Sequence, residues 1–257
     1  RILPLLITTV GFIFKKTLGV GGALGIGSAA KIIFGMDSAP MCIRPYLKDF
    51  TRSELFAFMS VGMATVAGTV MVVYATVLGG VIPDVIGHIL SASVINVPAA
   101  IMYARILIPD NGQMTEGTLK IASPAKNAMD AITRGAQDGI QVYVNVIAML
   151  MVLVGLIHLA NHILTYLPTL HGQPITLQGM LGYLLSPIMW LIGIPLEQAH
   201  TAGILMGTKT ILNELIAYID LSKLPAGSLS VKSQLIMVYA LCGFANFGSV
   251  GIMIGAL

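Results

Sequence analysis

The chain has 257 residues, of which 56% are hydrophobic and only 10% are charged, and its mean hydropathy is +0.88. Soluble domains carry about 25% charged residues, so this composition excludes a water-covered globule and predicts a protein solvated by membrane lipid. The net charge is +3 and the basic residues are scattered, which argues against a nucleic-acid-binding surface.

The first segment, residues 1–19, is an apolar run that ends in Lys15 and Lys16. A membrane-spanning helix needs about 20 apolar residues, so this shorter run predicts an interfacial helix or the tail of a span. The chain starts without Met and stops inside an apolar run, and we therefore expect a fragment truncated at both ends.

Residues 20–50 contain two short apolar stretches that flank a turn-forming segment, residues 34–40. Each stretch is too short to span a membrane. Two half-length helices with Gly and Pro between them are typical of a re-entrant hairpin. An uncharged run over residues 55–83 and a second apolar run over residues 85–108 then predict two spans, which completes a first repeat over residues 20–108.

The middle of the chain, residues 109–163, begins with a polar segment. Its later part, residues 125–139, is predicted to be an amphipathic surface helix, and residues 140–163 are predicted to be a connecting span. Residues 164–257 then repeat the earlier plan, with a second hairpin at 177–200, a helix at 202–220 and a last span from about 234.

Charge supports this arrangement, because Lys and Arg prefer cytoplasmic loops. If residues 177–200 return to their own side, every basic loop lies on the cytoplasmic face. The prediction is an all-α polytopic membrane protein with two re-entrant hairpins in inverted repeats, which favours a transporter over a channel.

Glu214 is the first functional candidate, because an ionisable side chain inside a membrane is costly to bury. The structural alternative is an ion pair with Lys209, five residues earlier. Asn213 adjoins Glu214, and a carboxylate beside amides and hydroxyls suits a sugar-like ligand, since it accepts hydrogen bonds from two hydroxyls.

Asn246 and Ser249 are three residues apart and are predicted to share a helix face. With Phe244 beside them they either line a ligand pocket or make interhelical hydrogen bonds, and the spacing does not decide between the two. Lys31 and Asp37 either close the first hairpin as an ion pair or contact a coupling ion or ligand. We find no convincing metal-ligand spacing, catalytic triad or phosphate-binding loop, so we expect neither an enzyme nor an organic cofactor.

Several stretches resemble the concentrative nucleoside transporter family, and together they cover nearly the whole chain. They are SAPMCIRPYL (38–47), TRSELFAFMSVGMATVAGTVM (51–71), SASVINVPAAIMYARILIP (91–109), MDAITRGAQDGIQ (129–141), GTKTILNELIAY (207–218) and YALCGFANFGSVGIMIG (239–255). The resemblance implies a homotrimer in the plasma (inner) membrane, with a nucleoside site in each protomer. It places the family's ribose-binding groups on Glu214, Asn246 and Ser249, with Phe244 near the ligand.

The chain departs from the family at the tip of the first hairpin. Well-studied members read Gly-Gln-Thr-Glu-Ala-Pro there and contact the base, whereas Met36, Asp37 and Ser38 occupy the middle of the motif here. Met cannot supply the amide pair of Gln. The resemblance therefore implies that these three residues face the base but leaves purine or pyrimidine preference open.

The resemblance also bears on the coupling ion, which we expect to be H⁺ or Na⁺. The family's sodium site takes a hydroxyl that falls on Thr65 and an Asn that falls on Lys31, and we add Asn213 to this ion-site region. A Lys ammonium can fill a sodium-sized hole with its own charge. The hypothesis is that the protein is proton-coupled or uncoupled.

The expected function is cation-coupled nucleoside uptake by alternating access, with protons favoured over sodium. One alternative is a carrier or channel for another small polar solute, which the altered hairpin tip permits. Another is a membrane-embedded hydrolase that uses Glu214, although such an enzyme would need a second acid or base nearby, and the sequence offers none.

Overall fold

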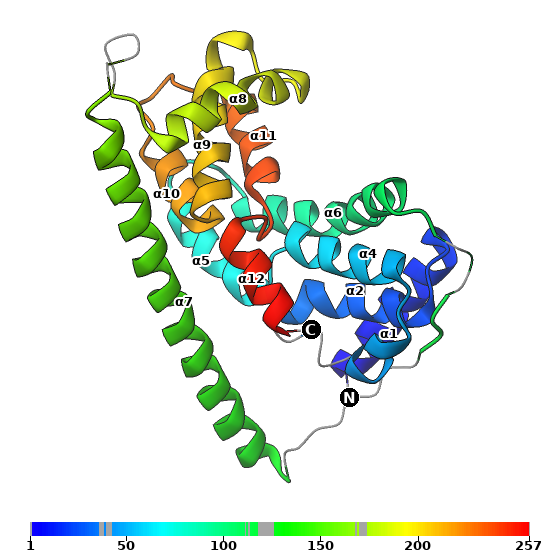
Figure 1. The fold of residues 1–257 in the computed structure, drawn as a ribbon. Coiled ribbons are helices and arrows are strands. Elements are labelled where there is room, and N and C mark those ends of the chain that lie inside the picture. The colour runs from blue at the N-terminus through cyan, green and yellow to red at the C-terminus, as the bar shows by residue number, and fades with distance from the viewer. Residues whose placement is uncertain are drawn as a thin grey trace.

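A computed structural model describes residues 2–35, 39, 43–110, 112, 114–117, 126–167, 169 and 174–256. The described residues contain helices, turns and loops and no strand, which confirms the all-α prediction (Figure 1). The helices are α1 (Ile2–Leu18), α2 (Gly22–Phe34), η1 (Arg44–Asp49), α4 (Arg52–Ala64), α5 (Gly68–Leu78), α6 (Val85–Leu107), α7 (Ala128–Leu164), α8 (Leu177–Leu191), α9 (Leu196–Ile211), α10 (Glu214–Lys223), α11 (Val231–Leu241) and α12 (Phe247–Ala256).

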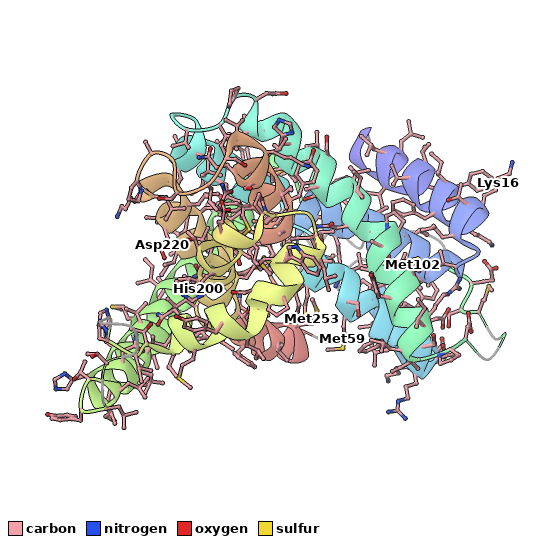
Figure 2. All side chains as sticks on the ribbon, turned by 90° about the horizontal axis from the view of Figure 1, so that it is seen from above. Lys16, Met59, Met102, His200, Asp220 and Met253 are labelled. Carbon is pink, nitrogen blue, oxygen red and sulfur yellow. The ribbon has the colours of Figure 1, made fainter. Side chains whose placement is uncertain are left out.

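Helix α6 joins two hydrophobic clusters. Its first half, with Ile89 fully buried, packs into an α5–α11 core, built from α5, α6 and α8 to α11. Its second half, with Ile101 nearly as buried, packs into an α2–α4 core, built from α1, α2, α4 and α6. Figure 2 shows the two regions side by side, with Lys16 and Met102 on the α2–α4 side and Asp220 on the α5–α11 side. The predicted span at 85–108 is thus observed as a single helix.

Within the described residues, α6 is the one helix long and apolar enough to cross a membrane by itself. Shorter apolar helices are α2, α8, α11 and the last part of α7, Met151–Leu164. Many large apolar side chains, such as Val144 and Leu156 on α7, remain exposed, as expected for a surface that faces lipid.

Three segments predicted to be continuous helices are interrupted. The predicted span at 55–83 breaks at residues 65–67, which lie between α4 and α5. Thr65 and Ala67 have extended backbone there. The helix predicted at 202–220 breaks between α9 and α10, because the Asn213 side chain caps α10 by accepting a hydrogen bond from the Ile216 N–H at 2.9 Å. The last predicted span breaks at residues 242–246.

Helix α7 joins two predicted elements, since the amphipathic helix and the connecting span form one continuous helix of 37 residues. It begins where the Asn127 side chain accepts a hydrogen bond from the Asp130 N–H at 2.8 Å. The Lys126 N–H and the Arg134 guanidinium donate to the Asp130 carboxylate and hold its pKa below the usual value. Figure 1 shows α7 along one edge of the molecule.

Glu54 connects several segments at the end of the molecule where α2 and α4 begin. It is only 3% exposed, and its carboxylate accepts hydrogen bonds from the backbone N–H groups of Thr51 (3.0 Å) and Thr115 (2.8 Å) and from the Thr115 hydroxyl (2.8 Å). A Cβ on Gly21 would lie 2.7 Å from the same carboxylate, so only glycine fits there. The start of α2 therefore lies against the start of α4.

We expect Glu54→Ala to lower stability by about 3 kcal/mol or more, because it leaves buried N–H donors without their charged acceptor. The measurement is the melting temperature of the purified protein in detergent. Glu116→Ala is the matched control. Its exposed ion pair with Lys15 is worth at most about 1 kcal/mol, and a comparable loss in both variants would contradict the assignment.

Candidate functional site

The two long helix breaks, at residues 65–67 and 242–246, lie against each other. A Cβ on Gly243, whose φ is +119°, would lie 2.7 Å from the carbonyl oxygen of Ala64, so the two chains approach at backbone distance. From α6, the Asn96 amide donates hydrogen bonds to the carbonyls of Ala64 (2.9 Å) and Cys242 (3.4 Å). The breaks therefore share one polar region, in which backbone groups freed from their helices find partners.

Glu214 is the first residue of α10, is 3% exposed, and points into this region. Its Oε1 accepts a hydrogen bond from the Tyr74 hydroxyl at 2.6 Å, and its Oε2 accepts a longer one from the Asn246 amide at 3.4 Å. A carboxylate at a helix N-terminus is stabilised by the helix dipole. The arrangement joins α5, α10 and the start of α12 at one carboxylate.

Lys209, on α9, supplies the compensating positive charge. It is 5% exposed, its charge acts on Glu214, and its ammonium donates a hydrogen bond to the Ala240 carbonyl at 2.9 Å. The sequence left open whether Lys209 pairs with Glu214 or Glu214 serves a ligand. The two roles are compatible, because the ammonium is held by α11 while the carboxylate faces Tyr74 and Asn246.

Asn246 and Ser249 are in contact, but through a helix cap and not as two residues on one helix face, because Asn246 precedes α12. The Asn246 side-chain oxygen accepts a hydrogen bond from the Ser249 N–H at 2.8 Å, while its amide faces Glu214. Asn246 and Ser249 are buried, and Phe244 lies half-buried in the break before them. The structure thus brings Glu214, Asn246 and Ser249 into one cluster.

Two of the three predicted ion-site residues, Lys31 and Thr65, contact the same part of α4. Lys31 is fully buried on α2, and its ammonium donates to the Phe58 carbonyl at 2.7 Å and lies 3.8 Å from the centre of the Phe58 ring. The Thr65 hydroxyl bonds back to the Val61 carbonyl at 2.9 Å, and a Cβ on Gly62, the next residue, would meet the Lys31 ammonium, so Lys31 and Thr65 lie at the same end of α4. Asn213 is occupied in capping α10.

The tip residues Met36, Asp37 and Ser38 lie outside the described residues, so their predicted contact with a base and the pairing of Asp37 with Lys31 stay predictions. Tyr74 and Asn96 were missed by the sequence reasoning. Their only signal was a polar group inside an apolar run, which many interfacial or interhelical residues share.

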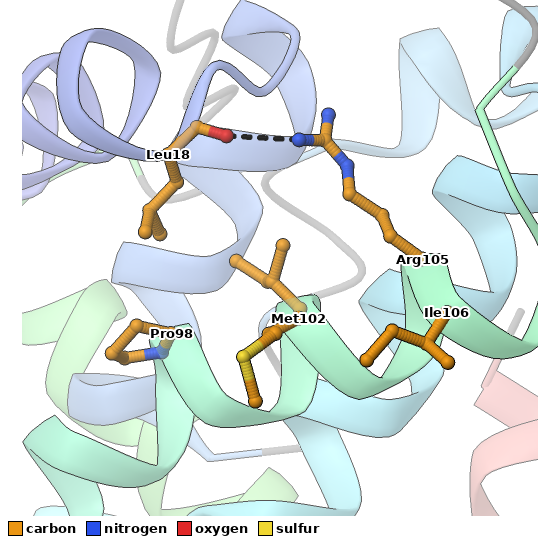
Figure 3. Close-up of a pocket in the computed structure, with 6 residues that line it drawn as sticks. Leu18, Pro98, Met102, Arg105 and Ile106 are labelled. Atoms are coloured by element: carbon orange, nitrogen blue, oxygen red, sulfur yellow. Dashed lines mark hydrogen bonds between the residues drawn. The ribbon is translucent and has the colours of Figure 1, made fainter.

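A groove between the end of α1 and α6 lies apart from this cluster (Figure 3). It is mostly apolar, and Arg105 at its edge donates to the Leu18 carbonyl at 2.8 Å and pairs with Asp110 at 3.1 Å. Within the described residues no group of three His, Cys, Asp or Glu side chains gathers that could hold a metal ion.

Comparison with known proteins decides the family. A family model described as the Na⁺ dependent nucleoside transporter C-terminus matches residues 88–257, which include Glu214, Asn246 and Ser249. The chain belongs to the concentrative nucleoside transporter family. This is a family of membrane transporters and not of enzymes, in agreement with the prediction from the sequence.

Relatives of this chain include the nucleoside permease NupC of Helicobacter pylori, which is 37% identical to it over 100% of this chain and 62% of the relative. An uncharacterised transporter of Bacillus subtilis, YutK, is 38% identical over 100% of this chain and 63% of its own length. Mouse solute carrier family 28 member 3 is 32% identical over 98% of this chain and 38% of its own length. The chain therefore spans less than two thirds of each of these relatives.

Solved structures of the concentrative nucleoside transporter CNTnw share the fold. An inward-facing, substrate-bound state matches with a TM-score of 0.86 and 36% identity, over 99% of this chain and 60% of that one. An outward-facing variant matches with a TM-score of 0.87 and 35% identity, over 99% and 62%.

Proposed function

We propose that the protein carries out cation-coupled nucleoside uptake by alternating access. The observation that carries the proposal is the buried Glu214 carboxylate, held by Tyr74 and Asn246 where two interrupted helices meet. Interrupted helices that meet inside a membrane are a transporter plan, because their free ends bind solutes and ions. The family membership and the similarity to a substrate-bound transporter support the same reading.

In this proposal Glu214, Asn246 and Ser249 hold the ribose, and Phe244 lies beside the ligand. The carboxylate accepts hydrogen bonds from sugar hydroxyls, since each of its oxygens has two lone pairs and Tyr74 and Asn246 use only one on each. Met36, Asp37 and Ser38 face the base.

The proposed architecture has two re-entrant hairpins, with an interfacial helix at 1–19, a first repeat at 20–108, a connecting region at 109–163 and a second repeat at 164–257. The contact between Gly21 and Glu54 supports a first hairpin that returns to its starting end. We propose that α9 and α10, and not the predicted segment 177–200, form the second hairpin. Gln198, near the start of α9, accepts a hydrogen bond from the Ser230 N–H at 3.1 Å.

That contact supports a reversal between α9 and α10. If the two helices continued in one direction, residues 198 and 223 would lie nearly 40 Å apart. The seven residues that follow, at about 3.4 Å each, could not bring Ser230 back. The tip of this hairpin is then Leu212–Asn213, with Glu214 directly after it.

Lys31 bears on which cation is coupled to uptake. The family model carries sodium in its name, whereas Lys31 already places a positive charge on α2. We therefore expect a proton gradient to drive uptake and a sodium gradient to have little effect. Sodium-driven uptake that Thr65→Val abolishes would contradict this. Thr76→Val is the matched control, because that exposed hydroxyl also bonds back along its helix.

The experiment that tests the function is uptake of labelled uridine and adenosine into proteoliposomes that contain the full-length protein, under a sodium or a proton gradient. Uptake of either nucleoside supports the proposal. No uptake of either would favour a carrier or channel for another small polar solute. We further propose a homotrimer of multi-pass protomers in the plasma (inner) membrane, which cross-linking in membranes would test.

A further inference from the structure

We propose that Tyr74 is a positioning residue that sets the direction of the Glu214 carboxylate and thereby the selectivity for sugar hydroxyls. The inference rests on the proposed nucleoside function. Its basis is the hydrogen bond from the Tyr74 hydroxyl to Glu214 Oε1, whose length of 2.6 Å lies in the range of charge-assisted O–H···O bonds.

The Tyr74 ring is held rigidly, so the hydroxyl can act as a fixed donor. The side chain is 1% exposed, and its ring packs against that of Tyr218 with centroids 4.9 Å apart. Tyr218 is in turn anchored, because its hydroxyl donates to the Val238 carbonyl on α11 at 2.9 Å. Tyr218 and Glu214 are four residues apart on α10 and so share a face, on which Tyr74 contacts both.

The other oxygen of Glu214 is held less firmly. Its donor is the Asn246 amide, at 3.4 Å, which is near the limit for a hydrogen bond. Tyr74 is therefore the stronger constraint on where the carboxylate points. The carboxylate keeps lone pairs for ligand hydroxyls only in the directions that Tyr74 leaves open.

The contact also joins distant parts of the chain. Tyr74 is on α5, which follows the break after α4, whereas Glu214 opens α10. Binding of a ligand hydroxyl to Glu214 therefore depends on the position of α5 as well as on that of α10. Tyr74 need not touch the ligand to influence which ligand binds.

The test compares Tyr74→Phe with Tyr218→Phe in full-length protein. Each variant removes one hydroxyl from one of two rings in contact, but only Tyr74 donates to Glu214. The readouts are KM and kcat for uptake of uridine, 2′-deoxyuridine and 3′-deoxyuridine into proteoliposomes, with the melting temperature as a check on folding.

For Tyr74→Phe we expect KM for uridine to rise about tenfold, the typical cost of a hydrogen bond to a charged group. We expect KM for the deoxyuridine that lacks the hydroxyl bound by Glu214 to rise much less, so that selectivity for uridine falls. Tyr218→Phe should keep the wild-type selectivity.

An equal rise for all three nucleosides, or an unchanged KM for uridine, would overturn the positioning role while leaving nucleoside transport in place. Equal loss of selectivity in both tyrosine variants would also overturn it. If the unmodified protein takes up none of the nucleosides, the proposed function fails, and the Tyr74 inference fails with it.

Discussion

Replacement of Glu214 by Gln is expected to lower uridine uptake by about 100-fold or more. The carboxyl group of Glu214 accepts hydrogen bonds at the junction of the helix breaks, and a hydrogen bond to a carboxylate contributes about 1.5–3 kcal/mol. Loss of two such bonds to sugar hydroxyls accounts for the 100-fold decrease, since each loss of about 1.4 kcal/mol weakens binding tenfold. The measurement is initial uptake of labelled uridine into proteoliposomes.

The control for this variant is Glu197→Gln on α9. It makes the same chemical change at an exposed position, and we expect uptake close to that of the unmodified protein. Gln has nearly the shape of Glu, but Glu214→Gln removes the negative charge that acts on buried Lys209, so the melting temperature of each variant is measured beside uptake. Uridine uptake that survives Glu214→Gln at the unmodified rate would exclude the carboxylate from the binding site.

Replacement of Lys209 by Met is expected to have the largest effect on stability. It removes a buried cation whose charge acts on Glu214 without a direct ion-pair contact, and a buried charge left uncompensated costs about 3–5 kcal/mol. The measurement is the melting temperature in detergent. Lys232→Met, an exposed change at the start of α11, is the matched control and should have little effect.

A double variant tests the coupling between the two charges. Once Glu214→Gln has removed the negative charge, Lys209→Met no longer leaves that charge uncompensated, so the double variant should be more stable than Lys209→Met alone. It should still fail to take up uridine. If instead the two stability losses simply add, Lys209 and Glu214 do not act as a pair.

The two predictions separate the roles of one buried pair. Lys209 is held by a backbone carbonyl and contributes charge balance, whereas Glu214 is held by side chains and keeps acceptor capacity. In alternating access, a site of this kind opens to one side of the membrane at a time and is closed to water between the two states. A balanced pair lowers the cost of keeping the carboxylate away from water.

Composition and hydrophobic length determined the class of this protein and several of its elements. The small charged fraction predicted the membrane solvent, and the apolar run at 85–108 predicted α6. The cost of burying a charge in a membrane also pointed to Glu214, without any knowledge of its neighbours. These inferences need only local sequence, because they depend on the transfer of side chains from water to lipid.

The tertiary structure decided where the helices break and what the breaks contact. Residues 65–67, 212–213 and 242–246 interrupt helices in runs whose apolar pattern continues through them, so periodicity carried no signal. Such breaks are stable because distant groups satisfy the freed backbone, as Asn96 does for Ala64 and Cys242. Tyr74 lies 140 residues from Glu214, and only packing of α5 against α10 brings them together. The sequence by itself determined which charged residues had to be functional or paired, and the tertiary structure decided their partners, because hydrogen bonds between distant segments depend on how the helices pack.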